Sequence, residues 1–217
     1  MHTISKDEYL EAGQIFHWAT QDHYKLWFTG SLDRHRRTEQ MMARLAKSKE
    51  IAFSDYGKKL VYAAKRMKNT PIAHGLGVTE TIVRIVRSGS DGTIIPERYF
   101  RGLGSVPDWG IQYREKLLLC EFSTQNNFEG ARIIKTKITK YNQNLEKILE
   151  RFRVSDVIVL FVIDVPRVRV LNFIVRNYPG AFFFFTDFET FKSVPLGKQL
   201  TAPIYIWKDG ESYPLKK

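Results

Sequence analysis

Hydrophobic and polar residues change their spacing about a third of the way along this chain. Up to about residue 70, apolar residues recur mainly at helical spacing, with two short alternating runs near the end of that part. After Pro71, helical stretches alternate with short, continuous apolar runs, which is the pattern of helices packed on a sheet. The segment Asn69-Thr70-Pro71 therefore predicts a linker between two domains, residues 1–70 and residues 71–217.

The first part is predicted to contain two helical segments, a basic helix and a hairpin. Apolar spacing indicates a helix over residues 6–20 and a second short element over 21–28. Ser31 is a favourable N-cap for a helix that continues toward Glu50. Two strands around residues 54–57 predict the hairpin. This order is that of a winged helix-turn-helix, in which a basic helix enters the major groove and the hairpin lies on the DNA backbone.

Basic residues gather on the third predicted helix and beside the hairpin turn. An ordinary helical subdomain whose arginines face water gives a similar pattern, so both interpretations stay open. The clustering of charge favours DNA. The predicted DNA contacts in this part are Arg34, Arg36, Arg37, Arg44, Lys58 and Lys59.

The second part predicts a mixed sheet with helices, an α/β (α+β) architecture in the order αβββαβαβ. Two of its strands are separated by a helix of the length that connects parallel neighbours. The expected elements are helix 72–89, strand 93–100, a hairpin over 106–122, helix 128–152, strand 156–164, helix 165–179, strand 181–187 and a terminal hairpin over 204–215.

Two acidic residues are predicted at the ends of adjacent strands. Pro107-Asp108 opens the first strand of the hairpin and Glu121 lies near the end of the second, so pairing would bring both carboxylates to one edge. Carboxylate oxygens suit Mg²⁺ or Mn²⁺, which activate water and offset charge on a phosphate. Glu80 on the preceding helix is a candidate third ligand. Each acid alone is more typical of a turn, a strand end or an exposed helix; the set indicates the site of PD-(D/E)XK phosphodiesterases.

Active nucleases of this fold carry a lysine two residues after the second acid, where this chain has Ser123. The lysine can move to the following helix, and Lys137 is the catalytic candidate there, with Lys135 an alternative. Lys135 and Lys140 are also predicted DNA contacts. The alternative interpretation is a site that no longer catalyses and keeps its shape as a DNA-binding surface. The sequence leaves both interpretations open.

Over most of its length, to about residue 190, the chain resembles the replication-relaxation family of plasmid and mobile-element proteins. The matching blocks are Ile72-Ala73-His74 with Val78-Thr79-Glu80, then Pro107-Asp108, Leu119-Cys120-Glu121, and Lys137 or Lys140 with Tyr141. The resemblance implies a winged helix joined to a nuclease-like domain, and a role in DNA replication, relaxation or transfer. The family's further acid is replaced by Ser123. Within the first block, His74 is a candidate hydrogen-bond partner of the site.

Charge and cysteine content narrow the classes of partner. With 34 Lys and Arg against 23 Asp and Glu, the chain carries a formal charge of +11, which favours a polyanion and most simply double-stranded DNA. The single Cys120 excludes an internal disulfide and a thiolate-rich zinc site. No apolar run approaches the ~18 residues of a membrane span, and the N-terminus is polar. We therefore expect a cytoplasmic protein.

Two functions follow as hypotheses. The first is a DNA-binding protein of a mobile element that works with replication or transfer proteins. Its nuclease-like second domain either nicks DNA with Mg²⁺ or Mn²⁺ or only grips it. The second is a non-enzymatic regulator of replication or transcription. In that case a degenerate nuclease fold serves for pairing of two copies or for binding a partner.

Overall fold

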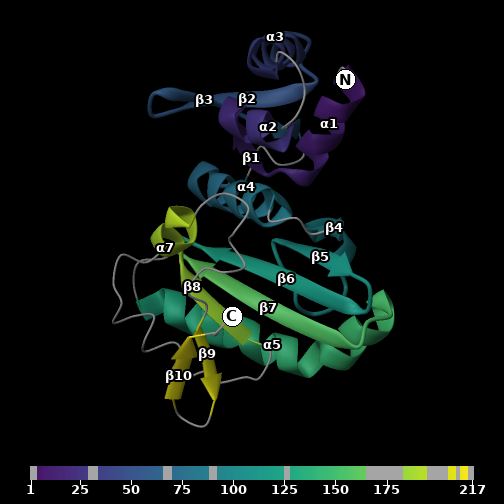
Figure 1. The fold of residues 1–217 in the computed structure, drawn as a ribbon, viewed down its shortest axis with the longest axis vertical. Helices are drawn as coiled ribbons and strands as arrows, with labels where there is room; N and C mark the ends of the chain where they lie inside the picture. The colour runs from purple at the N-terminus through teal and green to yellow at the C-terminus, as the bar shows by residue number, and fades with distance from the viewer. Residues whose placement is uncertain are drawn as a thin grey trace. The chain divides into compact units, whose positions relative to one another are not determined.

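The computed structural model of the chain describes residues 4–28, 34–65, 70–87, 92–124, 128–164, 183–194, 205–208 and 211–214. These residues form a mixed α/β structure with helices and two sheets (Figure 1). The chain divides into two compact units, Met1–Val83 and Arg84–Lys217. The division falls inside a helix and not at the expected boundary after residue 70, because the first turns of that helix pack with the N-terminal residues. None of the described helices is both long enough and apolar enough to cross a membrane.

The first unit is a three-stranded antiparallel sheet, in the order β1-β3-β2, with helices on its faces. Helix α1 begins at Ser5, whose side chain and that of Glu8 form a reciprocal capping box. The elements are α1 (Lys6–Ile15), β1 (Trp18–Thr20), α2 (Gln21–Trp27), α3 (Arg34–Lys47), β2 (Ile51–Tyr56) and β3 (Lys59–Ala64), followed by α4 (Ile72–Arg87), which belongs to this unit as far as Val83.

The predicted helix over residues 6–20 is wrong in its second half. Helix α1 ends at Ile15, and Trp18–Thr20 instead pairs with β3. Thr20 then caps α2, because its side chain accepts a hydrogen bond from the backbone of His23. The hairpin turn also lies later than expected, at Gly57-Lys58, where Gly57 adopts φ 62°. The expected N-cap Ser31 lies outside the described residues.

Both faces of this sheet are covered. On one face pack aromatic and apolar side chains of α1, α2 and α3, including the buried Met42 and Leu45 of α3. On the other face, Trp18 of β1 packs against Ile72 and Leu76 of α4. A Cβ atom on Gly75 would lie 2.6 Å from Trp18 Cδ1, so glycine permits this close contact between helix and strand.

The second unit is a seven-stranded sheet in the order β10-β9-β8-β7-β6-β5-β4. The pairs β4–β5 and β5–β6 are antiparallel, and β6–β7 and β7–β8 are parallel. The pairs β8–β9 and β9–β10 are again antiparallel. The elements are β4 (Thr93–Pro96), the 3-10 helix η2 (Glu97–Phe100), β5 (Trp109–Tyr113), β6 (Lys116–Ser123), α5 (Phe128–Phe152), β7 (Asp156–Ile163), β8 (Phe183–Asp187), α7 (Phe188–Ser193), β9 (Tyr205–Lys208) and β10 (Glu211–Pro214).

Helix α5 lies along one face of this sheet (Figure 1) and supplies much of its core. Ile134, Ile138 and Ile148 of α5 pack with buried residues of β6, β7 and β8. The parallel pairing of β7 with β8 confirms the expected strand direction. The helix predicted over residues 165–179 lies outside the described residues, and α7 was not predicted.

Candidate functional site

The predicted acid Asp108 lies directly before β5 and extends its pairing with β6. Its backbone N–H donates to the Cys120 carbonyl at 3.1 Å, and its Oδ2 accepts from the Phe122 backbone N–H at 2.7 Å. Because Trp109 pairs with Cys120, the next position on each strand places Asp108 opposite Glu121. Asp108 thus forms hydrogen bonds with the backbone of the residues on both sides of Glu121.

Glu121 is buried, with only 1% of its surface exposed, and both of its carboxylate oxygens accept hydrogen bonds from α5. The Tyr141 hydroxyl donates to Oε1 at 2.7 Å, and Lys137 Nζ donates to Oε2. These two donors are one helical turn apart, so they lie on the same face of α5. Buried Ser105, from the loop before β5, also hydrogen-bonds the Tyr141 hydroxyl.

The charges of this cluster depend on one another. Burial raises the pKa of Glu121 to about 7, and nearby Asp108 adds to the rise, whereas Lys137 and Tyr141 oppose it. Burial alone would lower the pKa of Lys137, but the carboxylates of Glu121 and Asp108 outweigh it and hold that pKa above 10.5. Burial and Glu121 raise the pKa of Tyr141, so its hydroxyl stays protonated as a donor. Lys137 therefore carries the positive charge of the site.

A cationic hollow of about 410 Å³ lies on α5 beside this cluster. Arg132, Thr136 and Lys140 recur every fourth residue, and all three are exposed. Ile133 and Lys137 complete its lining, so the hollow reaches the lysine that binds Glu121. Such a row of cations on one helix face is suited to the phosphates of a nucleic acid backbone. Lys135, also predicted as a DNA contact, is exposed on the same helix.

Glu80, expected as a third metal ligand, has a different partner. It lies on α4 within the first unit, where His23 Nε2 and Glu80 Oε2 are 2.7 Å apart. The backbone N–H of Thr20 donates to His23 Nδ1, so Nε2 is the nitrogen that carries the proton toward Glu80. Among the described residues, no three His, Cys, Asp or Glu side chains gather closely enough to hold a metal ion.

The expected DNA contacts of the first unit are exposed wherever their side chains are described. Arg37 and Arg44 are exposed on α3, and Lys58 lies at the hairpin turn. Lys59 follows it and forms an ion pair with Asp22 at 3.4 Å. The side chains of Arg34 and Arg36 fall outside the description, although their backbone belongs to α3.

His74 lies in the first unit with its ring 6.4 Å from that of His17. Sequence reasoning gave Tyr141 no role beyond its place in a motif and did not single out Ser105. The spacing of Lys137 and Tyr141, one turn apart on an otherwise apolar helix face, is the signal that could have identified the tyrosine.

Comparison of the chain with known protein families, with curated proteins and with solved structures found no match. Function is therefore inferred from the residues and contacts described above.

Proposed function

We propose that this chain is a double-stranded DNA-binding protein whose second unit is a nuclease-like domain that nicks DNA with the help of a divalent ion. One observation carries the proposal: Asp108, Glu121, Lys137 and Tyr141 converge at one end of the central sheet, beside a cationic hollow. The order of helix α4, strands β4 to β6, helix α5 and parallel strands β7 and β8 fits a PD-(D/E)XK core.

The two carboxylates suit a hard cation. Mg²⁺ is commonly held by one or two carboxylates, and waters and substrate phosphate oxygens complete its shell. Asp108 and Glu121 supply that minimum, and Asp108 is only partly buried. When bound, the ion would activate water for attack on a phosphodiester and offset charge on the phosphate.

The chain's own residues position and neutralise the reacting groups. Tyr141 fixes the orientation of the Glu121 carboxyl, and the charge of Lys137 opposes the rise in its pKa that burial causes. The same Lys137 ammonium borders the hollow, where it can stabilise negative charge that develops on a transferred phosphate. Arg132 and Lys140 hold the DNA backbone alongside. Lys137 thus takes the role that Ser123 cannot fill.

The first unit supplies DNA affinity in this proposal. Helix α3, with Arg37 and Arg44, and the hairpin turn with Lys58 have the order and charge of a winged helix-turn-helix. Together with the formal charge of +11 and the family resemblance, this supports a role in plasmid or mobile-element DNA replication, relaxation or transfer.

A second candidate is a non-enzymatic DNA-binding regulator of replication or transcription. It is favoured by the saturation of Glu121, because Lys137 and Tyr141 already occupy both of its oxygens. In that case the cluster fastens α5 to the sheet, and the absence of a lysine at Ser123 reflects lost catalysis.

A supercoiled-plasmid assay with Mg²⁺ or Mn²⁺ separates the two candidates. Wild type is compared with Asp108→Ala and with Asp156→Ala, a control that removes an exposed acid at the start of β7. Binding is scored in parallel on native gels. Nicking that is lost only in Asp108→Ala supports the nuclease. Equal binding without nicking in all three proteins supports the regulator, and absence of DNA binding overturns both.

A further inference from the structure

Strand β2 presents a long free edge in the first unit. It pairs with β3 through all six of its residues without a bulge, and none of the described strands pairs with its other side. The other sheet-edge strands of the described chain are shorter: β1 has three residues, and β4 and β10 have four each and end in Pro96 and Pro214. Short edges and prolines discourage pairing with another chain, and β2 has neither protection.

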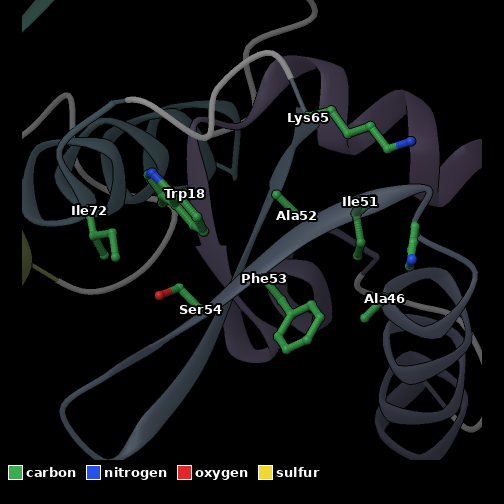
Figure 2. A pocket seen from close by; sticks show the side chains of 9 residues that line it. Trp18, Ala46, Ile51, Ala52, Phe53, Ser54, Lys65 and Ile72 are labelled. Carbon is green, nitrogen blue, oxygen red and sulfur yellow. The ribbon is translucent and has the colours of Figure 1, made fainter.

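A groove of about 590 Å³ follows this free edge (Figure 2). In the figure, Trp18 and Ile72 lie on one side of the β2 ribbon and Ala46 of α3 lies on the other. Phe53, in the middle of the strand, is 58% exposed. A strand that entered this groove would therefore gain backbone hydrogen bonds along β2 and cover an exposed aromatic ring.

We propose that two copies of the chain pair here through antiparallel β2 strands, with Phe53 on the twofold axis. A twofold axis requires a self-complementary edge, because wherever residue i of one copy meets residue j of the other, residue j of the first copy also meets residue i of the second. With Phe53 opposite Phe53 of the second copy, Ile51 lies opposite Asp55 of the second copy. The two exposed rings then form a cross-strand aromatic pair, which is among the favourable pairs in antiparallel sheets.

The charges at the two ends of the strand fit this register. Asp55 is exposed near the hairpin end of β2, whereas exposed Lys49 and Lys65 line the groove at its other end. Lys49 lies two residues before Ile51, so in this register it is the diagonal neighbour of Asp55 of the other copy. The register therefore brings Asp55 of each copy close to Lys49 of the other. This complementarity identifies a second copy as the occupant, in preference to an unrelated strand.

The association is tested on the full chain without DNA. Sedimentation velocity over a concentration series should show a monomer–dimer equilibrium. The variant Phe53→Cys should form a disulfide-linked dimer under mild oxidation, because directly opposed strand residues have Cα atoms about 4.5–5.5 Å apart, within disulfide range. The matched control is Leu60→Cys, similarly exposed (47%) but on the central strand β3. The natural Cys120 is buried and contributes little background.

Charge reversal tests the register. Asp55→Lys alone and Lys49→Asp alone should each weaken the dimer about tenfold, since two cross-strand ion pairs are lost per dimer. The double variant should recover wild-type association. Circular dichroism checks that each variant is folded. A wild type that stays monomeric, with Phe53→Cys crosslinking no more than Leu60→Cys, overturns the proposal and assigns the groove to a different strand. A dimer that is insensitive to both charge reversals also overturns it.

Discussion

Replacing Glu121 by Gln removes a buried titratable group while keeping the size of the side chain. In the wild type this carboxyl is fully buried and its pKa is about 7, against an ordinary value of 4.5. We expect the variant to lose the pH dependence of stability that this difference creates. The test concerns electrostatics of the cluster alone, and it does not depend on DNA or a metal ion.

The sign follows from proton uptake on folding. Between pH 4.5 and about 7 the unfolded chain has lost the Glu121 proton while the folded chain retains it, so stability falls as pH rises. The stabilisation that comes from this retained proton is fully present below pH 4.5, and its loss is complete above about pH 7. At 1.36 kcal/mol for each pH unit, wild type loses about 3 kcal/mol relative to Glu121→Gln across this range.

The assay is equilibrium urea unfolding of both proteins from pH 4 to pH 8. Hydrogen–deuterium exchange of peptides from β6 and β7 reads the second unit separately from the first. The difference between the two proteins reports the Glu121 cluster, because groups outside it titrate alike in both. Any constant offset from the loss of hydrogen bonds to Lys137 and Tyr141 does not affect the slope.

A difference that stays constant within about 0.5 kcal/mol, well below the expected linkage, would refute the reasoning. It would mean that Glu121 titrates in the folded state as it does in the unfolded state, and that Lys137 fully offsets its burial. The control is Glu146→Gln, which alters an exposed glutamate on the same helix α5. This variant should follow the wild-type curve throughout.

Two further changes test the first unit. Gly75→Ala should lower the stability of the fold by about 1–3 kcal/mol through overpacking. The reason is that the added Cβ would lie 2.6 Å from Trp18 Cδ1 and 2.9 Å from Trp18 N. Thermal denaturation measures this loss, and Ala73→Ser, at an exposed position of the same helix, is the control. Arg44→Gln should weaken DNA binding and reduce the slope of log affinity against log salt by about 0.9, the value for one phosphate contact. An unchanged slope would exclude Arg44 from the DNA interface.

The second unit was largely predictable from its sequence because its signals are local and strong. The continuous apolar run of β7 is typical of a strand buried on both faces, and the expected strand forms over eight residues, Asp156–Ile163. The helix predicted over residues 128–152 likewise matches α5, and its buried residues enter the core. Pairing of β5 with β6 followed from the short turn between them.

Features of the first unit depend on contacts that are distant in sequence, and there the predictions failed. Trp18–Thr20 has helical neighbours on both sides, and only pairing with β3 makes it a strand. Glu80 lies on the helix that was expected to supply a third metal ligand, yet its partner is His23, far away in the chain. Neither partner can be identified from hydrophobic periodicity, which reports burial without naming the neighbour.

The position of the lysine explains why the sequence left the site ambiguous. Side chains alternate along a strand, so residue 123 lies on the same face of β6 as Glu121, and a lysine there would reach the acid from the sheet itself. Helix α5 covers this same face, since Lys137 and Tyr141 both bond to Glu121. A lysine at position 123 would approach the Glu121 carboxyl from the sheet, whereas Lys137 approaches the same carboxyl from helix α5.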